Sequence, residues 1–112
     1  MRRIILGASL FTLLLAPTGG ARAADPQTFT GVISDDMCGL DHSGMGETDE
    51  KKCTLSCVDS GSDFVLADRE HKKVYLLDDQ KKPKEFAGAK VTIVGTLEGE
   101  TIHVQSITAT KP

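Results

Sequence analysis

The chain has 112 residues, with 13 basic and 16 acidic side chains and a formal net charge of −3. This length suits one small domain, and no apolar run reaches the roughly 20 residues that span a bilayer. An acidic surface repels phosphate groups, so the charge argues against nucleic acids and anionic lipids as partners.

The first 23 residues are expected to be a signal peptide. Arg2 and Arg3 are followed by an uncharged, mostly apolar run at 4–16, and 21–23 (Ala-Arg-Ala) matches the small-x-small pattern that signal peptidase cleaves. The domain would then be 24–112, exported to a periplasmic or secreted location. Three basic residues lie in the leader, so this part has 10 basic and 16 acidic residues, a balance of −6.

Alternating residues predict five strands. The first lies at 28–34, with Phe29 and Ile33 on one face. In the last strand, Ile107 breaks the alternation, which predicts a β-bulge near Gln105 or Ser106. The other predicted elements are strands at 63–67, 73–77, 90–97 and 101–108, with a turn or one helical turn at 81–88.

A cysteine-rich insertion at 35–61 interrupts the β pattern. Its first part, 35–46, is rich in Asp, Gly and Ser and is expected to be a loop, in which we interpret the aspartates as solvated. Asp49 is the expected N-cap of a short helix over about 50–59, which Gly61 ends. The loop aspartates that we interpret as solvated are Asp35, Asp36 and Asp41.

The order of elements predicts a mainly β fold. Five strands with a helical element between the third and fourth are typical of a small OB-like antiparallel barrel, here with a short Cys-bearing helical insertion between strands 1 and 2. An open antiparallel sheet with the cysteine helix packed on one face is the alternative.

The insertion carries the one dense cluster of metal-binding residue types. If 50–59 is helical, Cys53 and Cys57 stand on one face with β-carbons roughly 5–6 Å apart, too far for the ~3.8 Å of a disulfide. Both sulfurs could instead bind one ion. Three cysteines and a histidine suit zinc, and thiolate with thioether suits Cu(I). The candidate metal ligands are Cys38, His42, Cys53, Cys57 and Met45.

A disulfide is the alternative use of these cysteines. Cys38 could pair with Cys57 or Cys53 and close a loop of order 15–20 residues, typically worth ~3 kcal/mol. An export compartment permits disulfides, but three cysteines leave one thiol over. That thiol could be free, metal-bound, paired with a partner or redox-active.

The cysteine block and the strand motifs resemble a known group. Residues 31–38 (GVISDDMC), 42–45 (HSGM), 53–58 (CTxxCV) and 91–97 (VTIxGTL) look like those of small secreted bacterial proteins of unknown function. The resemblance implies that the block belongs to the domain as a unit, and it brings no activity. The C-terminal half is also similar to periplasmic bacterial OB-fold proteins, which lack the block.

These patterns predict an exported, non-enzymatic binding module that holds zinc or copper. The alternative is a disulfide-stapled structural or interaction domain that binds a peptide, a glycan or a small ligand without metal. A thiol oxidoreductase is a third hypothesis, although the chain lacks the C-x-x-C motif that is typical of such enzymes. His71 and His103 are expected to be solvated.

Overall fold

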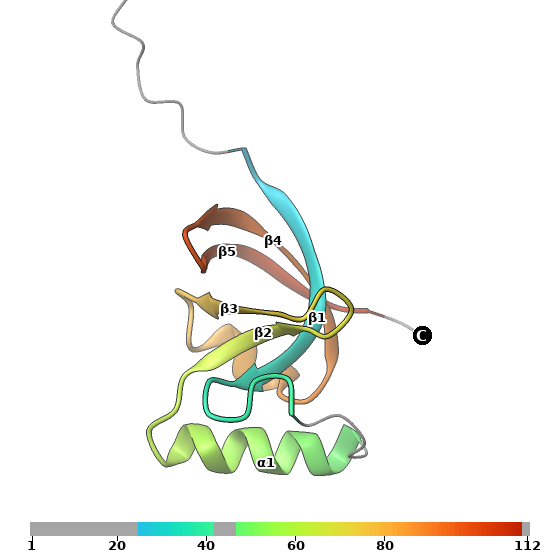
Figure 1. Ribbon diagram of the computed structural model, residues 1–112, viewed down its shortest axis with the longest axis vertical. Coiled ribbons are helices and arrows are strands. Elements are labelled where there is room, and N and C mark those ends of the chain that lie inside the picture. Colours follow the sequence, from blue (N-terminus) through green and yellow to red (C-terminus); the bar gives the residue numbers. More distant parts are fainter. Residues whose placement is uncertain (1–24, 42–46, 111–112) are drawn as a thin grey trace, which may run out of the picture.

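The computed structural model describes residues 25–41 and 47–110 (Figure 1). The predicted signal peptide lies outside the described residues. Five strands, one α-helix and one 3-10 helix make up the fold. They are β1 (Gln27–Asp35), α1 (Glu47–Asp59), β2 (Phe64–Asp68), β3 (Lys73–Leu77), η1 (Lys82–Phe86), β4 (Lys90–Glu98) and β5 (Thr101–Ala109).

The five strands close into a ring in the order β1-β2-β3-β5-β4, with β4 returning to β1. The prediction of a mainly β, five-stranded fold with a cysteine helix between the first two strands is confirmed. The prediction that every pair is antiparallel is wrong at one place. β3 and β5 run parallel because β4, which lies between them in sequence, runs in the opposite direction to both. The two strands pair only at Leu76↔Thr101 and Leu77↔Ile102.

The ring encloses the core. On β1 the inward positions alternate as expected, and Phe29 and Ile33 are both buried. Leu55 and Val58 of α1 pack against the core from outside the ring. The buried core residues are Phe29, Ile33, Phe64, Leu66, Leu77, Ala87, Val91, Ile93 and Ile102.

The predicted bulge is confirmed in the β4–β5 pair. Val94 pairs with Ser106, whereas the next residue, Gly95, pairs with Val104. Gln105 is therefore the extra residue, and it shifts the later part of β5 so that Ile107 lies opposite Ile93.

Helix α1 begins three residues earlier than predicted. Asp49 is therefore the third residue of the helix and not its cap. An acidic side chain is also favourable at this position, because the whole first turn is the positive end of the helix. The predicted end is confirmed. Gly61 has φ +113°, and the amides of Gly61 and Ser62 donate to the carbonyls of Val58 and Cys57 at 3.0 Å. This pattern closes the last helical turn.

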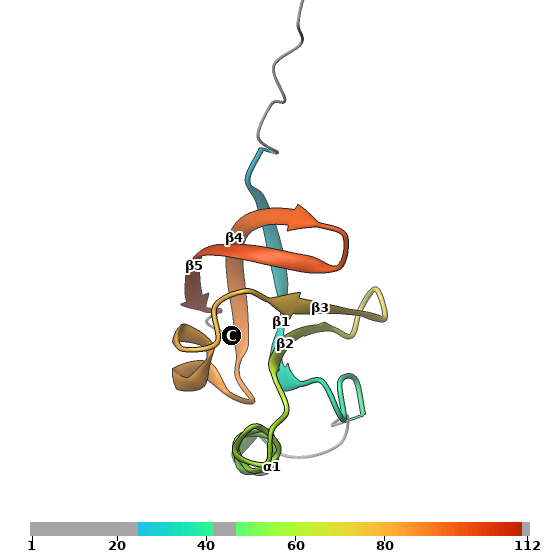
Figure 2. The ribbon, with the colours of Figure 1, turned by 90° about the vertical axis from the view of Figure 1, so that its left-hand side faces the viewer.

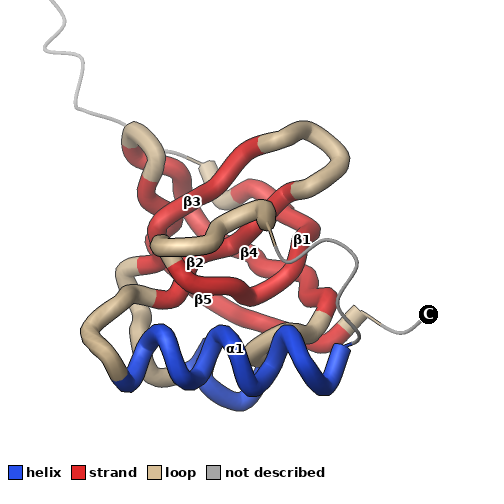
Figure 3. The backbone as a smooth tube through the Cα atoms, turned by 60° about the horizontal axis from the view of Figure 1, so that its bottom comes forward, coloured by secondary structure: helices blue, strands red, loops and turns tan. Residues whose placement is uncertain are grey.

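Helix α1 lies across one end of the ring, beneath the last residues of β1 (Figures 1 and 2). Figure 3 shows the same end from the side of the helix, with α1 in front of the strands. The contact is close at Gly88, where an added Cβ would lie 2.5 Å from the amide nitrogen of Lys51. None of the helices in the described part of the chain has the length and apolar character needed to cross a membrane.

Candidate metal centre

The fold brings the three cysteines together. Cys38 lies in the turn after β1, and Cys53 and Cys57 lie on α1. Their Sγ atoms all lie within 4.8 Å of one another, and all three residues are partly buried. Among the described residues, this is the group of cysteine, histidine and carboxylate side chains close enough to hold a metal ion.

The turn that carries Cys38 is fixed by hydrogen bonds around the end of β1. The Cys38 amide donates to Asp35 Oδ2 at 3.0 Å, and the Gly39 amide donates to the Asp35 carbonyl at 2.8 Å. The buried hydroxyl of Ser34 donates to the Gly39 carbonyl at 3.0 Å. Side-chain and backbone bonds therefore hold this cysteine at one place over the helix.

Helical periodicity places the other two sulfurs. Cys53 and Cys57 are four residues apart in a continuous helix, so their side chains share one face. Cys57 is also the residue whose carbonyl accepts from Ser62 in the closing turn. The structure contains the predicted pair of helical sulfurs with the earlier sulfur within reach. The imidazole predicted beside them, that of His42, lies outside the described residues.

Asp35 contradicts its prediction as a solvated loop carboxylate. The residue is fully buried and is the last residue of β1. It has the same parity as Phe29 and Ile33, which point inward, and extending that alternation by one step would have found it. Asp36, one residue later, is exposed as expected.

Burial and the charge of Asp35 together raise the pKa of two of the thiols. Burial is the main cause that raises the pKa of Cys57 from 9.0 to about 11, and the charge of Asp35 is the next. A hydrogen bond between the two side chains acts in the same direction. Burial and then Asp35 likewise raise the pKa of Cys38. The thiols of Cys38 and Cys57 are therefore held in their protonated form at neutral pH when no ion is bound.

The sulfur triangle has almost the size that a bound ion needs. With every side at most 4.8 Å, a point exists within about 2.8 Å of all three sulfurs. A Zn–S bond is about 2.3 Å, so side-chain movements of about half an ångström would complete the site. A disulfide requires two sulfurs at about 2.05 Å. No disulfide joins the described cysteines, and the Cys38–Cys57 pairing stays a prediction.

Two predicted ligands, His42 and Met45, lie outside the described residues. The described residues therefore supply three of the five predicted ligands.

Comparisons with protein-family models, curated proteins and solved structures find no match to the chain.

The two other histidines each have acidic partners. His71 Nδ1 lies 2.8 Å from an Asp68 carboxylate oxygen. His103 lies between two carboxylates, with Nδ1 3.1 Å from Asp78 and Nε2 2.7 Å from Glu98. Both imidazoles are exposed to solvent, His71 at 67% and His103 at 45%. The two carboxylate contacts of His103 come from the turn after β3 and the end of β4, and its immediate sequence neighbours do not show them.

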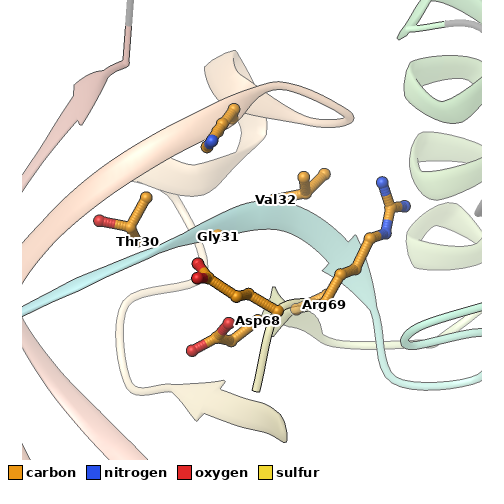
Figure 4. Close-up of a pocket in the computed structure, with 8 residues that line it drawn as sticks. Thr30, Gly31, Val32, Asp68 and Arg69 are labelled. Carbon is orange, nitrogen blue, oxygen red and sulfur yellow. The ribbon is translucent and has the colours of Figure 1, made fainter. Parts of the chain in front are cut away.

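A hollow of about 260 Å³ lies between β1 and the turn that follows β2 (Figure 4). Arg69 points from this turn toward α1, where its guanidinium pairs with the buried Glu50. The described residues that line the hollow include no cysteine or histidine, and its volume is below the roughly 300–1,000 Å³ of small-molecule sites. We therefore assign it no ligand.

Proposed function

We propose that this protein is an exported, non-enzymatic binding module that holds a soft or borderline metal ion, zinc or copper, at Cys38, Cys53 and Cys57. The observation that supports this proposal is the convergence of three sulfurs within 4.8 Å from two separate elements of the fold. Thiolates in such a cluster favour Zn²⁺ and Cu(I) over hard cations.

The predicted fourth ligand is His42, with Met45 as the reserve. In the sequence, both follow Cys38 and precede the helical residues Cys53 and Cys57. A Cys3His set would be a closed tetrahedral zinc site, which is the structural type and leaves no open position for a substrate. This is why the proposal is a binding or structural role rather than catalysis.

The proposed architecture is an OB-type barrel, and the proposed setting is outside the cytoplasm. The strand order β1-β2-β3-β5-β4, with η1 between β3 and β4, supports the first part. The leader at 1–23 supports the second.

Native mass spectrometry of protein recovered from its own compartment, reduced and loaded with zinc, tests the proposal. We expect a mass that lacks 1–23 and one bound ion per chain. Cys38→Ser, Cys53→Ser and Cys57→Ser should each weaken binding, because each removes a thiolate ligand. Ser56→Ala is the matched control, since Ser56 lies on the same helix and is exposed. A protein that stays metal-free after reduction and loading would refute the proposal.

A second hollow favours the alternative, a module that binds a peptide, a glycan or a small ligand. It has a volume of about 460 Å³ and lies between the β2–β3 turn and the β4–β5 turn. Tyr75 and Leu97 give it apolar walls, and Lys72, Lys73 and Glu100 give it charged ones. OB-type barrels bind oligomers on this part of the fold. Tyr75→Ala should abolish binding in a glycan and peptide array if this function is correct.

A further inference from the structure

Asp35 is a carboxylate side chain beside the cysteine cluster. Its residue is fully buried. Its Oδ2 accepts the Cys38 amide at 3.0 Å. After burial, its charge is the next cause that raises the pKa of Cys38 and of Cys57. Its charge therefore acts both on the turn that carries one sulfur and on the helix that carries the other two.

The net charge of a loaded site depends on the ion. Three thiolates and this carboxylate have a formal charge of −4, so a divalent ion leaves −2 and Cu(I) leaves −3. Excess charge is costly at a buried position, where the effective dielectric constant is low. Because Asp35 adds one negative charge at a short distance, it favours the ion that brings more positive charge.

Ligand preference acts in the same direction. Zn²⁺ accepts carboxylate oxygen as well as thiolate sulfur, whereas Cu(I) selects soft sulfur ligands. An oxygen that already holds the backbone of Cys38 is therefore useful to a zinc ion, because it orients a residue that supplies a ligand. The same oxygen offers little to Cu(I).

We propose that Asp35 determines the metal preference of this site by shifting it toward a divalent, zinc-type ion relative to Cu(I). The proposal rests on the proposed function, and it resolves the choice between zinc and copper that the cysteines alone leave open. It identifies a specificity-determining residue that is not one of the predicted ligands.

The test measures zinc and Cu(I) affinities in separate chelator competitions, at one pH and without oxygen, on the reduced protein recovered after expression of the full chain. Asp35→Asn should lower the ratio of zinc affinity to Cu(I) affinity at least about tenfold, since residues around metal ligands typically alter metal affinity 10–100-fold. Asp36→Asn is the matched control. It removes the same charge one residue away, on an exposed side chain, and should leave the ratio unchanged.

The ratio separates specificity from a purely structural effect. A looser fold or a change in thiol ionisation would alter both affinities together, because both ions bind the same sulfurs. Circular dichroism of the metal-free variant checks that it folds. If Asp35→Asn does not fold, Asp35→Thr is the second neutral variant, since its hydroxyl can accept the Cys38 amide and its branched side chain suits a strand.

The outcomes distinguish the two proposals. A folded neutral variant with an unchanged ratio overturns the role of Asp35 and leaves the metal site standing. An unsubstituted protein that binds neither ion refutes the proposed function itself. A ratio that falls in the Asp35 variant and not in Asp36→Asn supports both.

Discussion

Gly88 lies directly against the backbone of α1 at Lys51. A Cβ at Gly88 would stand 2.5 Å from the Lys51 amide nitrogen and 2.9 Å from its Cα. The amide of Gly88 also donates to the Ile33 carbonyl of β1 at 2.8 Å. This one turn therefore sets how closely the helix approaches the end of β1, and so how near the two helical sulfurs come to Cys38.

Gly88→Ala should displace α1 and weaken both folding and metal binding. Gly99→Ala is its matched control, because both glycines have positive φ (+75° and +62°) but a Cβ added at Gly99 would meet no other described residue within 4 Å. Left-handed backbone strain of about 1–2 kcal/mol is common to both variants. The clash should add about 1–3 kcal/mol at Gly88 alone. Urea unfolding and a zinc titration measure the difference, and equal losses in the two variants would contradict the close packing described here.

His103 should make stability depend on pH. Hydrogen bonds to Glu98 and Asp78 raise the pKa of His103 above 6.5. The stabilisation is therefore fully present below about pH 6.5 and is lost as the pH rises through the higher folded-state value. His103→Gln should be less stable than the unsubstituted protein at pH 5.5, and the gap should narrow by pH 8.5. Urea unfolding at the two pH values tests this, and a gap that widens with pH would refute it.

Asp78 gives the acid side of the same cluster. A hydrogen bond from the Val104 amide is the main cause that lowers the pKa of Asp78, burial opposes it, and His103 lowers it further. Its contribution is present above about pH 3.8 and is lost as the pH falls through the folded-state value. Asp78→Asn should therefore flatten the acid limb of the stability profile in urea unfolding between pH 5 and pH 2.5. An acid limb as steep as that of the unsubstituted protein would show that the contacts between Asp78 and β5 do not depend on the charge of this carboxylate.

Cys57 should react slowly with iodoacetamide in the folded, metal-free protein. A pKa of about 11, against an ordinary 9.0, means about 100-fold less thiolate at neutral pH. Alkylation at pH 7.5 followed by peptide mass spectrometry gives the rate for each cysteine, and the same reaction in urea is the control. A rate at Cys57 faster than in urea would favour a reactive thiol and would contradict the protonated thiol described here.

Much of the fold follows from local patterns. Each strand appears within one or two residues of its predicted bounds, because alternation of apolar residues is a direct consequence of one buried face. The bulge at Gln105 was detectable because Ile107 falls out of step with Val104. The parallel pairing of β3 and β5 was not detectable, since no local pattern records that these two strands lie side by side in the same direction.

The candidate site was only partly visible in the sequence. The i and i+4 spacing of Cys53 and Cys57 predicts a shared helix face from periodicity alone. The burial of Asp35 and its effect on the pKa of Cys57 depend on how α1 covers the end of β1, which is a tertiary relationship. The same applies to His103, whose two carboxylate partners lie 25 and 5 residues away.

Zinc-edge X-ray absorption on the reduced, zinc-loaded protein tests the central claim most directly, because it counts the sulfur atoms around the ion. The three-thiolate site predicts three sulfurs at about 2.3 Å. That number should fall to two in Cys38→Ser, the variant that removes the sulfur outside the helix. A zinc ion bound only by nitrogen and oxygen, or a protein that excludes zinc while two of its cysteines are joined in a disulfide, would contradict the account.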